Sequence, residues 1–117
     1  MSGTLSNRGP AAVNAEATAI GIYTRKVTIH IERRWHIFRR QKGDYVTYGN
    51  MRIRFDVNKK GQTQNVRVLS SDANPIMADF TLSAILGAKV DPMPAEVVRE
   101  LALANGLLEI TYDVIIY

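Results

Sequence analysis

The chain has 117 residues, of which 46% are hydrophobic, so it can form one globular domain with a single core but not two. It contains no cysteine, which excludes disulfides, thiolate zinc sites and cysteine nucleophiles, and no apolar run approaches the roughly 18 residues of a membrane span. The net charge of +4 combines +9 over residues 1–68 with −5 over residues 69–117, which indicates either a polyanion-binding surface or two opposite faces meeting within one domain.

Residues 1–18 are predicted to be a flexible lead or linker, and residues 19–117 to form the folded domain. The lead is rich in Ser, Gly, Asn and Ala, with Gly9-Pro10 in the middle and no hydrophobic period. Because it offers little apolar surface, we expect it to contribute nothing to folding stability. It also lacks the charged and apolar regions of a signal peptide, so an export signal or anchor is expected outside this chain.

The segment from Tyr23 to Phe38 fits two periods. Val27, Ile29 and Ile31 alternate with polar residues, as in a strand. At helical spacing, one apolar stripe includes both large aromatic residues, and its members are Tyr23, Val27, Ile31, Trp35 and Phe38. Burial of such a stripe outweighs helix-propensity differences of a few tenths of a kcal/mol per residue, roughly. We therefore predict a helix.

A β-hairpin is predicted next. Residues 51–57 alternate apolar and polar side chains, and residues 58–62 form a turn in which Gly61 can take a positive φ. Val66 and Val68 then alternate with Arg67 in the returning strand. The stretch 44–48 either extends the first strand or forms a separate turn, and the sequence leaves both open.

A second helix is predicted to start at Asn74, a capping residue, with Pro75 in the first helical position and Gly87 placed to terminate it. A proline-containing link precedes one or two helical turns in residues 95–104. Residues 107–117 then form a long amphipathic strand. The predicted fold class is therefore α+β: a small, mostly antiparallel three-stranded sheet with two main helices packed on one face, in the order α-β-β-α-β.

No enzyme is predicted. His30 and His36 are six residues apart and would point to different helix faces, so no metal site is expected. Ser70-Ser71 lacks the glycines of a nucleophile elbow, and the glycines are too scattered for a phosphate loop. No catalytic residue and no cofactor is assigned.

The basic run between Arg25 and Lys42 supports an alternative function, a small basic nucleic-acid-binding domain. Seven cations and one acid lie there with Trp35 and Phe38 between them, and basic side chains with aromatics suit phosphates and bases. Both aromatics fall on the predicted apolar stripe, however, which favours a core role, so nucleic acid is not expected as the partner. The same basic helix could instead contact anionic lipid or an acidic partner.

Three features follow one another along residues 23–117: a tyrosine-to-tryptophan helix, a hairpin ending in a serine pair, and a helix followed by prolines. The residues that carry them are Tyr23, Val27, Ile31 and Trp35, then Ile53–Val57, Gly61 and Val66–Ser71, then Asp79, Ala84, Ile85, Ala88, Pro92 and Pro94. In this order and spacing they resemble the C-terminal domains of the TonB/TolA family. Lys60-Gly61 replaces the family's frequent Asp-Gly, and Asp72 follows the serine pair in place of glycine. The TonB-like and TolA-like branches both stay open.

The resemblance implies a periplasmic protein–protein interaction domain of an energy-transducing envelope protein, anchored to the inner membrane by a segment absent from this chain. It implies coupling of an inner-membrane motor to outer-membrane transporters or other envelope proteins, with an extended partner segment pairing beside the last strand.

The last strand is also the predicted docking edge on physical grounds. It has two charged residues and neither a lysine nor a proline to blunt an edge, so strand addition by a partner, or pairing with a second copy in a homodimer, is expected. The alternative is a central strand, flanked by the hairpin strands on both sides. The predicted partner-binding residues are Leu107, Leu108, Glu109, Ile110, Thr111, Tyr112, Asp113, Val114 and Ile115.

Overall fold

The computed structural model describes residues 3–6, 18–42 and 49–116. The elements are β1 (Gly3–Ser6), α2 (Ala19–Gln41), β2 (Gly49–Val57), β3 (Thr63–Ser71), α3 (Pro75–Leu86), α4 (Ala95–Glu100), a 3₁₀ turn η3 (Ala102–Ala104) and β4 (Leu108–Ile116). The stretch 44–48, which the sequence leaves undecided, lies outside the described residues. Within the described part, no helix has the length and apolar character needed to span a membrane.

The predicted first helix is confirmed as α2 and is longer than expected. Thr18 caps it by accepting a hydrogen bond from Gly21 N at 2.9 Å, and the Lys42 N–H donates to Phe38 O at the other end. The predicted stripe faces the core: Tyr23, Val27, Ile31 and Trp35 are buried and Phe38 is partly buried against them. Tertiary burial therefore decides the helix against the strand-like alternation.

The hairpin is confirmed as β2 and β3. Its turn is held by Asn58, whose side-chain oxygen accepts hydrogen bonds from the N–H groups of Lys60 and Gln62 at 3.0 Å. Gly61 has a φ of +82°, and a Cβ there would overlap the backbone oxygen of Val90. The turn therefore needs glycine both for its backbone angle and for the close approach of the link between α3 and α4.

The second helix, α3, begins as predicted. The Asn74 side chain accepts a hydrogen bond from Met77 N at 2.8 Å, and Pro75 occupies the first helical position. Gly87 ends the helix with a φ of −90°, so no left-handed cap forms. A Cβ at this position would overlap Nη2 of Arg34. The glycine therefore makes room for an arginine that donates to Ala84 O at 3.0 Å and Ser83 O at 3.1 Å.

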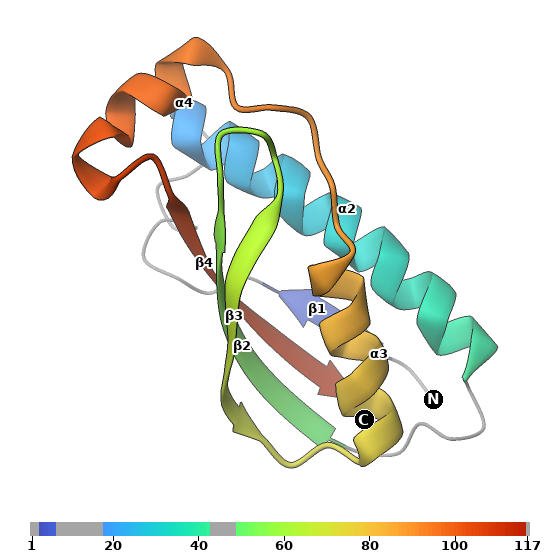
Figure 1. The fold of residues 1–117 in the computed structure, drawn as a ribbon. Helices are drawn as coiled ribbons and strands as arrows, with labels where there is room; N and C mark the ends of the chain where they lie inside the picture. Colours follow the sequence, from blue (N-terminus) through green and yellow to red (C-terminus); the bar gives the residue numbers. More distant parts are fainter. Residues whose placement is uncertain (1–2, 7–17, 43–48, 117) are drawn as a thin grey trace.

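The sheet is antiparallel and has the order β1-β4-β2-β3 (Figure 1). Three of its strands are those predicted, and the α+β class with the order α-β-β-α-β is confirmed for residues 19–116. The fourth strand, β1, lies in the segment that the sequence assigns to a flexible lead. It pairs with the end of β4, with Gly3 opposite Ile116 and Ser6 opposite Asp113. The contact is a pairing of four residues between distant parts of the chain, so no hydrophobic period in the sequence announces it.

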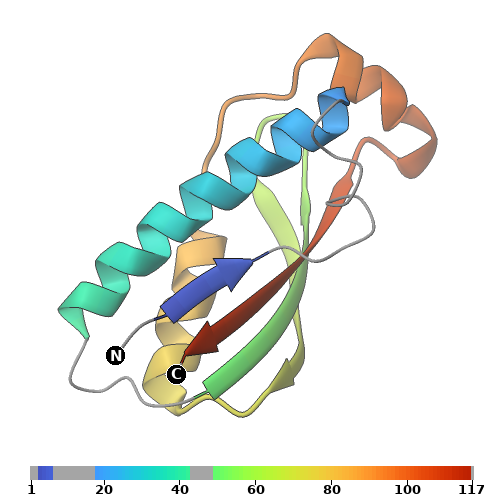
Figure 2. The ribbon, with the colours of Figure 1, turned by 180° about the vertical axis from the view of Figure 1, so that it is seen from behind.

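The core lies between the sheet and the helices. Alternate residues of β4, from Leu108 to Val114, face it together with Ile53 and Phe55 of β2. The rings of Phe55 and Tyr112 stack at 5.2 Å. Figure 2 shows α2 running along the length of the sheet, and α3 packs against both α2 and β3. In the described part of the chain, no helix covers the opposite face of the sheet.

Candidate functional site

The predicted docking strand is central in the sheet and not its outermost strand. Along one side β4 pairs with β2 over its whole length, from Leu108 opposite Val57 to Ile116 opposite Gly49. Along the other side, its outer edge, it pairs with β1 over Asp113–Ile116 (Figure 2). Of the nine predicted partner-binding residues, Leu107 directly precedes the strand and the other eight lie within it.

The outer edge of β4 is consequently divided into two parts. Opposite Asp113–Ile116 it is occupied by β1, whereas Leu108–Tyr112 have no strand beside them on that side in the described part of the chain. The expectation of an edge free along its whole length is therefore corrected. The alternative prediction was a central β4 flanked by both hairpin strands. One neighbour is indeed the hairpin strand β2, but the other is β1, from the N-terminal segment.

The side chains of β4 separate into two sets. Leu108, Ile110, Tyr112 and Val114 are buried in the core, as their alternation predicted. On the other face, Glu109 is exposed and Thr111 and Ile115 are partly buried. The core-facing set fixes the register of β4 on β2, because a slip of one residue would turn every apolar side chain outward.

Both acids of β4 are paired across the sheet. Asp113 lies directly opposite Arg52 of β2 and accepts from its Nε at 2.7 Å, which raises the pKa of Arg52 above its ordinary value. Glu109 lies 3.6 Å from Arg54 and 3.9 Å from Arg67. Arginines from the basic half of the sequence thus pair with acids from the acidic half. This agrees in part with the interpretation that the two charged halves meet within one domain.

The backbone directly before β4 is turned sharply. Asn105 and Gly106 have φ values of 57° and 71°, and Gly106 N donates to Leu101 O at 2.9 Å. Glycine adopts such an angle without a Cβ clash, and asparagine is among the residues that tolerate it best. This turn sets where β4 begins and therefore which residues reach the outer edge.

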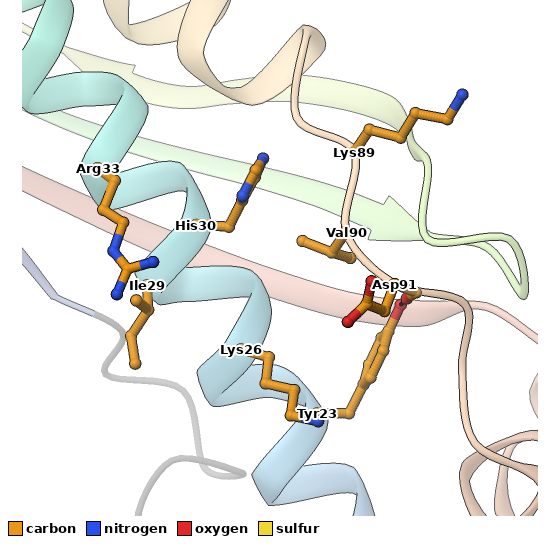
Figure 3. Close-up of a pocket in the computed structure, with 8 residues that line it drawn as sticks. All are labelled: Tyr23, Lys26, Ile29, His30, Arg33, Lys89, Val90 and Asp91. Carbon is orange, nitrogen blue, oxygen red and sulfur yellow. Dashed lines mark hydrogen bonds between the residues drawn. The ribbon is translucent and has the colours of Figure 1, made fainter.

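A second candidate site, which the sequence did not indicate, lies between α2 and the link of residues 89–91 (Figure 3). It is an open pocket of about 450 Å³, with Lys26, Ile29, His30 and Arg33 on one wall. Tyr23 closes one end by donating its hydroxyl to Asp91 O at 2.7 Å, and Val90 N donates to Gly61 O at 3.1 Å. The link is therefore held from both sides, and the pocket has a fixed wall.

The histidines and Trp35 are placed as follows. His30 lines this pocket, where burial, then Arg34 and Arg33, lower its pKa. His36 lies 3.7 Å from Glu32 on the same helix. No group of three or more metal-ligating side chains occurs in the described segments.

Trp35 is fully buried, so it offers no surface on which a nucleic-acid base could stack. The nucleic-acid hypothesis therefore loses the aromatic residue on which it depended.

Comparison with known proteins identifies the family. The profile of the Gram-negative bacterial TonB protein C-terminal family matches residues 46–112, more than half of the chain. This stretch includes the whole of β2, β3, α3 and α4, and β4 as far as Tyr112. No curated protein sequence matches.

A solved structure is similar in fold. The solution structure of the TonB C-terminal domain from Helicobacter pylori superposes with a TM-score of 0.56, at 16% sequence identity, over 92% of each chain. The chain therefore belongs to the family of Gram-negative bacterial TonB protein C-terminal domains, which are domains of envelope energy-transducing proteins.

Proposed function

We propose that this domain is the periplasmic end of a protein anchored in the inner membrane, and that it couples an energy source there to outer-membrane transporters. It does so by binding an extended segment of its partner along the outer edge of β4. Membership of the TonB C-terminal family supports the envelope role. In this proposal the domain is an interaction module and carries out no catalysis.

The observation that carries the proposal is the division of the outer edge of β4. Over Asp113–Ile116 this edge already accepts an antiparallel strand, β1, from the same chain. Over Leu108–Tyr112 it has no strand beside it in the described residues. An edge of this kind offers unpaired N–H and C=O groups, and a partner strand satisfies them by β-augmentation.

The side chains of β4 favour such an addition. The strand contains no proline and no lysine, and both of its acids are paired with arginines of β2 and β3. Every residue of β4 therefore keeps its backbone N–H for pairing, and an incoming strand meets no unpaired acid on β4. The backbone of the incoming strand provides affinity, and its alternate side chains beside Glu109 and Thr111 provide specificity.

Disulfide mapping tests the proposal. The chain has no cysteine, so Thr111→Cys places a single thiol on β4, and Ser70→Cys places a matched control on β3 at the opposite end of the sheet. Each variant is oxidised with synthetic peptides that cover the periplasm-facing segments of the bacterium's outer-membrane transporters, each with one cysteine moved along the sequence.

We expect Thr111→Cys to cross-link to one peptide, most efficiently at every second peptide position, because side chains alternate along a strand. Ser70→Cys should cross-link poorly and without alternation. Preferential cross-linking of Ser70→Cys would move the site to the β3 edge and contradict the proposal. Rapid disulfide dimerisation of Thr111→Cys that no peptide suppresses would indicate a second copy of the chain as the occupant instead.

A further inference from the structure

The cationic charge of α2 is not balanced by the acidic half of the chain. The arginines of β2 and β3 are paired with Glu109 and Asp113. On α2, the sole acid is Glu32, which lies beside His36. Lys26, Arg33 and Arg40 have no acidic side chain within 4.0 Å in the described residues.

These three cations recur every seven residues, which places them in line along one side of the helix. Isoleucines occupy the same side, and each is exposed to a degree unusual for its type: 53% for Ile22, 37% for Ile29 and 47% for Ile37. The outward face of α2 is defined here as Ile22, Lys26, Ile29, Arg33, Ile37 and Arg40. It points away from the stripe that packs on the sheet, and it contains no acid.

Two hollows open along the outward face, and Arg33 lines both. One is the pocket of Figure 3, where Lys89 joins Lys26 and Arg33 as a third cation, with the imidazole of His30 and one acid, Asp91, also in the lining. The other is lined by Arg33, His36, Ile37, Arg39 and Arg40. Each combines guanidinium or ammonium groups with an exposed isoleucine. A negatively charged headgroup with a short apolar neighbour would fit such a hollow.

We propose that the outward face of α2 is a binding surface for an anionic phospholipid membrane, separate from the strand-pairing edge of β4. The 23-residue helix lies flat on the lipid, its isoleucines enter the boundary between headgroups and acyl chains, and its cations bind the phosphates. The proposal does not depend on the identity of the strand-pairing partner.

The distribution of side chains decides between lipid and other occupants. Two copies of the domain packed through this face would bring the cations of each against those of the other, which disfavours a homodimer here. A dry protein interface would have to desolvate cations that stand between the isoleucines. In the headgroup zone, charged and apolar groups are accommodated at one depth, because Lys and Arg extend their charged ends towards the phosphates on long apolar stems.

Nucleic acid is the other polyanion considered as an occupant, and it suits the outward face of α2 less well than lipid does. Single strands are held by stacking on aromatic rings, and the one tryptophan of this helix is buried. Duplex phosphates would use the cations but leave three isoleucines exposed to water. The electrostatic part of binding should be shared by all polyanions, whereas the isoleucine part should be specific to lipid.

Vesicle co-sedimentation with the full chain tests the proposal. The probes are vesicles of phosphatidylglycerol mixed with phosphatidylcholine, vesicles of phosphatidylcholine alone, soluble pyrophosphate as competitor, and a DNA duplex. Binding should require phosphatidylglycerol and weaken with salt. Soluble pyrophosphate should not displace the vesicles, since it has no apolar part to contact the isoleucines.

Two triple variants separate charge from apolar contact. Lys26→Gln/Arg33→Gln/Arg40→Gln should weaken partitioning roughly a hundredfold, because each cation near an anionic surface contributes roughly a factor of five. Ile22→Ser/Ile29→Ser/Ile37→Ser should weaken vesicle binding and leave weak duplex binding unchanged. The matched control, Lys59→Gln/Lys60→Gln/Arg99→Gln, removes the same charge from exposed positions elsewhere and should change little.

A spectroscopic probe checks the contact directly. Ile29→Trp should show a blue-shifted emission with anionic vesicles, whereas Leu103→Trp, at a fully exposed position on η3, should not. Anionic headgroups near His30 should also favour its protonated form, so its pKa, which is lowered in the free domain, should rise on binding.

Equal binding by the α2 charge variant and its control would overturn the proposal. So would duplex affinity exceeding vesicle affinity, or a vesicle affinity that is indifferent to the isoleucines.

Discussion

Trp35 of α2 donates its indole N–H to the Thr81 hydroxyl of α3 at 3.0 Å, and both residues are completely buried. The indole also contacts Phe80, with ring centroids 5.5 Å apart. A buried indole nitrogen needs an acceptor, and Thr81 supplies it where the two helices meet. The polar pair therefore fixes how α2 and α3 are positioned on each other and on the sheet.

Trp35→Ala should destabilise the domain by about 3–5 kcal/mol, because it removes the largest buried side chain and leaves a cavity. Urea unfolding followed by circular dichroism measures the change. Trp35→Phe, which keeps much of the apolar volume, should lose less. A folded Trp35→Ala protein of wild-type stability that fails only in ligand binding would contradict the core role.

Thr81→Val should be more destabilising than Thr81→Ser, although valine matches threonine in shape. Valine leaves the Trp35 N–H buried without an acceptor, at a cost of about 1–3 kcal/mol, whereas serine retains the hydroxyl. Denaturant midpoints compare the two directly. A valine variant at least as stable as the serine variant would show that the hydrogen bond contributes nothing.

Alkaline unfolding should depend on Tyr112. Burial raises the pKa of this residue well above 10, and burial followed by the Asp91 carboxylate raises that of Tyr23. For a tyrosine whose pKa is higher in the folded state, stability is fully present below the unfolded value of about 10 and is lost as the pH rises above it.

Tyr112→Phe removes the ionisable group, so the loss of stability above about pH 10 should become smaller than in the wild type. Unfolding free energies measured on both sides of that pH provide the test. Identical alkaline loss in the wild type and in Tyr112→Phe would contradict the assigned shift.

The elements that bury a stripe could be predicted from the sequence. The Tyr23–Phe38 stripe, the Asn74-Pro75 helix start and the alternation from Leu108 to Val114 all appear in the structure as expected. Each is a periodic set of apolar side chains or a local capping pattern, and such a pattern can be recognised within a short stretch of sequence.

The neighbour of β4 could not be predicted in this way. β1 contacts β4 through backbone pairing between residues 3–6 and 113–116, which are the two ends of the chain. The pocket beside α2 was missed for a related reason. Its wall depends on contacts of Gly61 and Tyr23 with Val90 and Asp91, all distant in sequence.

Deletion of residues 1–7 should cost little stability, because β1 contributes a pairing of four residues at one end of the sheet. The deletion should at the same time strengthen binding of a strand-pairing peptide, since the outer edge becomes open up to Ile116. Thermal unfolding and peptide titration check the two effects. A loss of several degrees in Tm would show that the segment is an integral part of the fold.

Backbone amide exchange along β4 tests the central claim, that a partner strand pairs with its outer edge. In the free domain, alternate amides of Leu108–Tyr112 should exchange quickly, while those directed at β2 stay slow. Addition of the cross-linking transporter peptide should slow the fast set and leave β3 unchanged. Contradictory results would be uniformly slow exchange in the free monomer, or peptide protection confined to Thr63–Ser71.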